Sequence, residues 1–134
     1  MPMPVSTATN AYDLLDDVKA LALEEPKRIA MGWWLVQNGY SSDALLVRVL
    51  KGGFPECGTV GCVGGWVEVL TGNNVRAVKV LGLTEDQGLR LFYPPGLVEE
   101  EGQTIEHATA VVAHITAFQA LHEARLKAKA VTPC

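Results

Sequence analysis

The predicted fold rests on one stretch of the chain, Cys57-Gly58-Thr59-Val60-Gly61-Cys62-Val63-Gly64-Gly65-Trp66. On a helix of about 100° per residue, the apolar side chains of this stretch and of the next few residues fall within a stripe about 120° wide. These side chains are Val60, Val63, Trp66, Val67 and Leu70. The glycines Gly61, Gly64 and Gly65 fall on the roughly opposite face. The stretch therefore predicts a helix from about Thr59 to Gly72 with one bulky face and one bare face.

Three glycines inside a helix cost about 2–3 kcal/mol relative to alanine, so another interaction must offset them. Close approach of a second helix over Gly61, Gly64 and Gly65 supplies such an interaction, because no side chain holds the two backbones apart. We therefore expect this helix to lie at the centre of the core, covered on both faces. The alternative is that the bare glycine face leaves room for a ligand or a partner.

Apolar residues recur at helical spacing in the rest of the chain, and no strand-type alternation of useful length occurs. Asn10, Thr84 and Thr104 are suited to cap helices, and Thr84 with Gln87 has the pattern of a capping box. The further helices are expected from Ala11 to before Pro26, over 26–39, 44–50, 74–81 and 84–93, and from Thr104 to about Lys127. The predicted class is all-α, a compact bundle of six or seven short helices around the glycine-rich helix, with a long C-terminal helix.

The length of 134 residues suits a single domain. We expect a disordered N-terminal tail over 1–9, which is rich in Pro, Ser and Thr, a helical domain over 10–128, and a flexible C-terminal tail over 129–134. The first ten residues have neither the basic nor the apolar part of a secretory signal, and no apolar run is long enough to span a bilayer. A cytoplasmic location is therefore expected.

Composition disfavours several classes of protein. Hydrophobic residues make up 49% of the chain and charged residues 19%, which excludes global disorder. The net charge of −4 makes nucleic acid an unlikely partner, because such binding draws on Lys and Arg that neutralise phosphates. Three cysteines are too few for a secreted disulfide framework. Neither of the common glycine-rich phosphate-binding motifs is present.

Cys57 and Cys62 allow four interpretations. The plain one is that both are small buried hydrophobic residues, and on that basis no cofactor is expected. The alternatives are a disulfide or redox pair, half of a zinc site, and a nucleophilic thiol. If Cys62 lies near the start of a helix, the helix dipole is expected to lower its pKa and make it reactive.

The zinc and nucleophile alternatives both need a histidine. Cys57 and Cys62 with His107 and His114 would make an accepted Cys₂His₂ set. However, His107 and His114 are seven residues apart, which places them about 10 Å apart along one helix. The weak zinc alternative is therefore Cys57, Cys62 and His107. In the nucleophile alternative, either histidine would accept the proton of Cys62.

Four aromatic residues are candidates for binding a partner protein: Trp33, Trp34, Phe54 and Tyr93. Trp33 and Trp34 point about 100° apart on a helix, so one is expected nearer the surface, where tryptophan often marks an interface. Self-association through Trp33 or Trp34 is one expectation. The acidic loop around Glu99-Glu100-Glu101 would suit a basic partner surface.

The stretch from Cys57 to Trp66, followed by Leu70-Thr71-Gly72, resembles a family of small bacterial and phage-encoded proteins whose pattern is roughly C-G-T-x-x-C-I-A-G-W. Gly64 stands where that pattern has alanine. The similarity extends over about residues 12–118 and includes five weaker parts. They are Val78 to Leu83, Gln87, Leu91-Phe92-Tyr93, Thr104 to Ala108, and Val111 to Ile115.

The resembled family has no assigned activity, so the resemblance implies a fold unit and no reaction. Together with the residues, it favours a non-enzymatic accessory protein of a phage or mobile element that acts by protein–protein interaction, as a homodimer in one version. The alternative is a thiol-based redox or zinc-binding protein that uses Cys57 and Cys62 with a histidine of the last helix.

Overall fold

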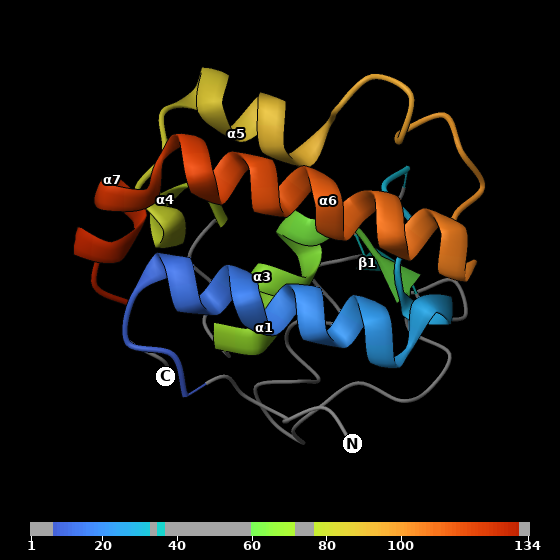
Figure 1. The fold of residues 1–134 in the computed structure, drawn as a ribbon, viewed down its shortest axis with the longest axis horizontal. Helices are drawn as coiled ribbons and strands as arrows, with labels where there is room; N and C mark the ends of the chain where they lie inside the picture. Colours follow the sequence, from blue (N-terminus) through green and yellow to red (C-terminus); the bar gives the residue numbers. More distant parts are fainter. Residues whose placement is uncertain (1–6, 33–34, 37–59, 72–76, 132–134) are drawn as a thin grey trace.

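The computed structural model describes residues 7–32, 35–36, 60–71 and 77–131, and Figure 1 shows their arrangement. Its elements in chain order are α1 (Ala11–Glu24), the 3₁₀ turn η1 (Pro26–Arg28), β1 (Leu35–Val36), β2 (Val60–Gly61), α3 (Val63–Thr71), α4 (Ala77–Leu81), α5 (Glu85–Phe92), α6 (Ile105–Leu121) and α7 (Glu123–Ala128). The predicted all-α class is confirmed. The helix expected over 44–50 lies outside the described residues.

Helices α1 and α6 run antiparallel and side by side along the bundle (Figure 1). α1 begins where predicted, because the side chain of Asn10 accepts a hydrogen bond from Asp13 N at 2.8 Å. α6 begins after Thr104, whose hydroxyl accepts from His107 N at 3.1 Å. Each helix turns an apolar stripe inward, and these stripes form one core cluster with the buried residues of α3.

Helix α3 is the buried centre that the sequence predicts. All of its residues are buried except Glu68, which is partly exposed, and it packs against α1, α4 and α5. Gly64 and Gly65 are both buried. The helix therefore has cover on all sides but the one that carries Glu68.

The predicted start of this helix at Thr59 is wrong. α3 begins at Val63, and the two residues of β2 pair antiparallel with β1 instead, with Leu35 opposite Gly61 and Val36 opposite Val60. Gly61 consequently belongs to β2 and is no part of the helical glycine face, which is reduced to Gly64 and Gly65. In β2 the backbone groups bond to a neighbouring strand, which competes with the first turn of a helix.

The helix expected over 26–39 is also wrong over its described part. After η1 the backbone at Ile29 is extended, with φ −111° and ψ 123°. The reason is that tertiary partners take up the backbone groups of this segment, so helical bonds are not needed to satisfy them. Trp66 Nε1 donates to Arg28 O at 2.8 Å, Gln103 N donates to Ile29 O at 2.7 Å, and Met31 N donates to His107 Nε2 at 3.2 Å.

The last predicted helix is divided. α6 ends at Leu121, and His122, at φ −120° and ψ 26°, separates it from α7. Next, the two ends of the domain pair with each other: Val131 N donates to Thr9 O at 3.0 Å, and Ala11 N donates to Lys129 O at 2.9 Å. Thr9 and residues 129–131 therefore belong to the folded domain, in contrast to the tails expected over 1–9 and 129–134.

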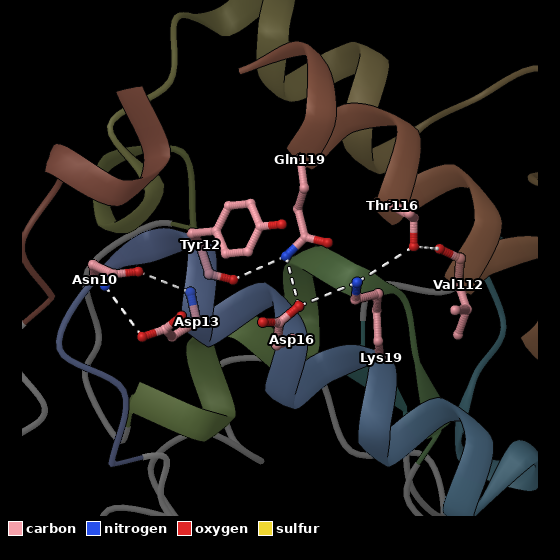
Figure 2. A network of polar contacts seen from close by, with 8 residues as sticks. All are labelled: Asn10, Tyr12, Asp13, Asp16, Lys19, Val112, Thr116 and Gln119. Atoms are coloured by element: carbon pink, nitrogen blue, oxygen red, sulfur yellow. Dashed lines mark hydrogen bonds and ion pairs between the residues drawn. The ribbon is translucent and has the colours of Figure 1, made fainter. Parts of the chain in front are cut away.

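A polar network joins α1 to α6, and we call it the α1–α6 seam (Figure 2). Its members are Tyr12, Asp16, Lys19, Thr116 and Gln119. The side chain of Gln119 is buried, and its Nε2 donates to Tyr12 O and to Asp16 Oδ1, both at 2.9 Å. Lys19 Nζ lies 3.1 Å from Asp16 Oδ1 and donates to Thr116 Oγ1 at 3.3 Å. These directional bonds fix how far one helix can slide along the other.

Helices α4 and α5 lie beside this layer and are short. The capping box predicted at Thr84 is confirmed: Thr84 Oγ1 accepts from Gln87 N at 3.2 Å, and Gln87 Oε1 accepts from Thr84 N at 2.9 Å. After α5, the chain over 93–104 returns across the bundle to α6. Gly102 has φ +81°, and a Cβ there would lie 2.6 Å from Ala30 Cβ, so only glycine lets the loop approach this closely.

Within the described part of the chain, no helix is both long enough and apolar enough to cross a membrane.

Candidate functional site

The Cys62 thiol lies in the core, directly before α3, and is 1% exposed. Burial raises its pKa from 9.0 to about 11, because desolvation of the thiolate outweighs the lowering effect of the N–H groups of Gly64 and Gly65. The lowered pKa expected from the helix dipole is therefore wrong. A thiol with a raised pKa stays protonated near neutral pH and is a poor nucleophile.

His107 holds three segments together. A backbone N–H can only donate, so the bond from Met31 N to Nε2 makes Nε2 the acceptor and places the ring proton on Nδ1. That proton points to Glu100 Oε2, 2.7 Å from Nδ1. Both ring nitrogens of this buried histidine are thus engaged in joining α6 to the segment after η1 and to the acidic loop. In this arrangement His107 has no free lone pair with which to bind zinc or to accept the proton of a thiol.

His114 is placed differently. Its Nε2 lies 3.1 Å from Leu91 O, so this nitrogen donates and links α6 to the last turn of α5. Among the described residues, the ring hydrogen bonds of His107 and His114 go to Met31, Glu100 and Leu91, and none of them goes to Cys62. Within the same residues, no three His, Cys, Asp or Glu side chains gather in a way that could hold a metal ion. Cys57, the remaining member of the zinc and redox alternatives, lies outside the described residues.

Three of the four aromatic residues that the sequence offers as binding residues, Trp33, Trp34 and Phe54, lie outside the described residues. The fourth, Tyr93, follows α5 and is 47% exposed. It lies at the edge of a hollow of about 300 Å³ between α4 and α5, which we call the α4–α5 groove. Of the predicted binding residues, Tyr93 is thus the one that the structure places at a concave surface.

The walls of the α4–α5 groove are apolar. Val78 comes from α4, and Gly88, Leu89 and Phe92 come from α5. A Cβ on Gly88 would lie 2.9 Å from Val78 Cγ2, so the absence of a side chain at this position lets the two short helices meet. Leu89 lines the groove and is nevertheless 55% exposed, so it stands out beside the hollow.

Two further residues of the groove lining carry opposite charges. Lys79 is on α4 and Glu85 is in the first turn of α5, and both are exposed. Glu85 also suits the N-terminal end of α5, where the helix dipole favours an acidic side chain. The α4–α5 groove therefore presents one cation, one anion and an apolar hollow.

Comparisons of the chain with protein-family models, with curated proteins and with solved structures found no match. The site must therefore be interpreted from its own geometry.

Sequence reasoning did not single out Leu89, Val78 or Gly88 as binding residues. A signal for Leu89 was present in the chain. Gly88, Leu91 and Phe92 follow the i, i+3, i+4 spacing of the inward face of α5, and Leu89 lies about 100° away from Gly88. A leucine off the inward face of a short helix is expected to be exposed, but a single exposed leucine is common on protein surfaces and gains meaning here only from the hollow beside it. Val78 and Gly88 carry no such signal, because only the packing of α4 against α5 brings them together.

Proposed function

We propose that the protein acts by binding another protein and not by catalysis, and that the α4–α5 groove is the binding surface. The observation that supports this is the hollow itself, walled by Val78 and Phe92, with Leu89 and Tyr93 exposed at its edge. An exposed tyrosine beside an apolar hollow matches the anchors and pockets that dominate protein–protein interfaces, and the exposed Leu89 adds apolar area next to it.

The two side chains considered for chemistry, Cys62 and His107, support the same proposal. The Cys62 thiol is buried with a raised pKa, and both ring nitrogens of His107 are used in internal hydrogen bonds. These groups serve the fold. A hollow of about 300 Å³ is also at the lower end for a small-molecule site, and it fits the insertion of one or two side chains. The accessory role in a phage or mobile element is carried by the sequence resemblance alone.

A photo-crosslinking residue placed at Tyr93 tests the proposal. In cells that produce the full chain, we expect one dominant covalent adduct, whose second component is identified by mass spectrometry. Binding is then measured with the two purified proteins. We expect Leu89→Asp, which puts a charge into the apolar groove, to weaken that binding at least tenfold.

The matched control is Leu121→Asp. Leu121 is 75% exposed and is not part of the groove lining, so this variant adds the same charge elsewhere on the surface. We expect it to bind as the unsubstituted protein does. Equal loss in both variants, or no adduct at Tyr93, would overturn the assignment of this groove as the binding surface.

A further inference from the structure

We propose that the molecule that occupies the α4–α5 groove is a second copy of this chain, related to the first by a two-fold axis. This inference rests on the proposed function and names the partner at the same surface. In a two-fold dimer the same patch of both copies meets itself, so the patch must carry both halves of every interaction. The α4–α5 groove does so in shape and in charge.

The shape argument concerns Leu89. This side chain belongs to the groove lining, yet more than half of it is exposed, so the patch holds an apolar projection next to an apolar hollow. In a two-fold arrangement, Leu89 of each copy enters the hollow of the other, between Val78 and Phe92. Each insertion buries an apolar side chain that is exposed in the separate chains, and this burial favours association.

The charge argument concerns Lys79 and Glu85. Lys79 is on the α4 side of the groove and Glu85 is on the α5 side. Among the described residues, neither side chain forms an ion pair or a hydrogen bond with another residue. Across a two-fold axis, Lys79 of each copy faces Glu85 of the other, so both charges gain a partner of opposite sign.

The net charge of the whole chain also favours a patch whose own charges balance. The chain has a net charge of −4, so two copies repel each other over most approaches. At the groove, one lysine and one glutamate cancel, which removes the local repulsion. Among the described residues, seven line the groove, fewer than the roughly 20–30 per side of a stable interface, so we expect a weak and reversible dimer.

Sedimentation experiments with charge-reversed variants test the inference. We expect the unsubstituted chain to pass from monomer to dimer between about 1 µM and about 1 mM. Lys79→Glu gives a patch with two anions, and Glu85→Lys gives a patch with two cations. Each variant alone is expected to dimerise at least tenfold more weakly, because like charges then face each other twice.

The decisive sample is an equal mixture of the two variants. In the mixed dimer, Glu at position 79 of one copy faces Lys at position 85 of the other, and Lys79 faces Glu85 at the second contact. Dimerisation should therefore return in the mixture to the strength of the unsubstituted chain. Both positions that are changed, 79 and 85, are exposed, and a thermal melt of each variant checks that it is folded.

A chain that stays monomeric up to about 1 mM, or variants that dimerise as the unsubstituted chain does, would overturn this inference. Dimerisation that stayed weak in the mixture of the two variants would overturn it as well. These results leave the proposed function standing if the adduct at Tyr93 contains a different protein. Conversely, a missing adduct at Tyr93 together with monomeric behaviour would remove both.

Discussion

The α1–α6 seam and the α4–α5 groove are both contacts between two helices, and they differ in how they are closed. At the seam, two long helices are joined by directional bonds from Gln119 and Lys19 across the interface. At the groove, two short helices meet through the absence of a side chain at Gly88, and the apolar surface between them stays open. Hydrogen bonds thus hold α1 and α6 in one register, whereas the close approach at Gly88 leaves part of the apolar surface between α4 and α5 exposed.

The largest difference in stability is expected between a leucine of α1 and a leucine of the α4–α5 groove. Leu15→Ala removes a fully buried side chain of α1, and we expect the free energy of unfolding to fall by about 2–5 kcal/mol. Leu89→Ala removes a half-exposed side chain of the groove, and a change within about 0.5 kcal/mol is expected. Urea unfolding of both variants measures the two values. Similar losses in both would contradict the view that the groove is open surface.

The next effect concerns Cys62, directly before α3, the helix that packs against α1, α4 and α5. Between pH 9 and 11 the folded chain keeps the Cys62 proton that the unfolded chain releases, because the pKa is raised from 9.0 to about 11 in the fold. The folded state is thus favoured below this window, and we expect up to about 3 kcal/mol to be lost as pH rises through it.

Unfolding of Cys62→Ala over the same pH range supplies the reference for this loss. The other titrating groups are common to both proteins, so the difference between the two curves isolates the thiol. A difference that stays constant from pH 8 to 11 would show that the thiol is not desolvated as described.

The smallest of the three effects tests how much the hydrogen bonds of the seam stabilise the fold. Gln119→Met keeps a side chain of similar size and removes both hydrogen bonds to α1, so we expect a loss of about 1–2 kcal/mol. Thr116→Val, at the exposed end of the same network, should cost less. Thermal melts measure both. An unchanged or raised melting temperature for Gln119→Met would show that packing alone joins α1 and α6.

The sequence predicts best those features that depend on neighbours three or four residues away. The caps at Asn10, Thr84 and Thr104 each bond a backbone N–H three residues on, and each marks the start of a helix as predicted. The inward stripe of α3 follows from its spacing as well. The beginning of α3 was predicted four residues too early, because the pairing of β2 with β1 involves residues far away in the chain.

The candidate site shows the same division. Tyr93 was predicted as a binding residue from its type and its place after a helix, and the structure puts it at the groove. The plain interpretation of Cys62 as a small buried residue agrees with its 1% exposure. The alternative of a reactive thiol with a lowered pKa fails, because the desolvation around Cys62 depends on everything packed against it, which helical position does not reveal.

The sequence by itself determined the helical class, the capped helix starts and the burial of α3, because these depend on local hydrogen bonds and on apolar periodicity. The extended backbone at Ile29, the linking role of His107 and the open α4–α5 groove all depend on tertiary packing. The bond from Met31 to His107 spans 76 positions and that from Trp66 to Arg28 spans 38. Such bonds form only when packing brings distant segments together, so no local pattern encodes them.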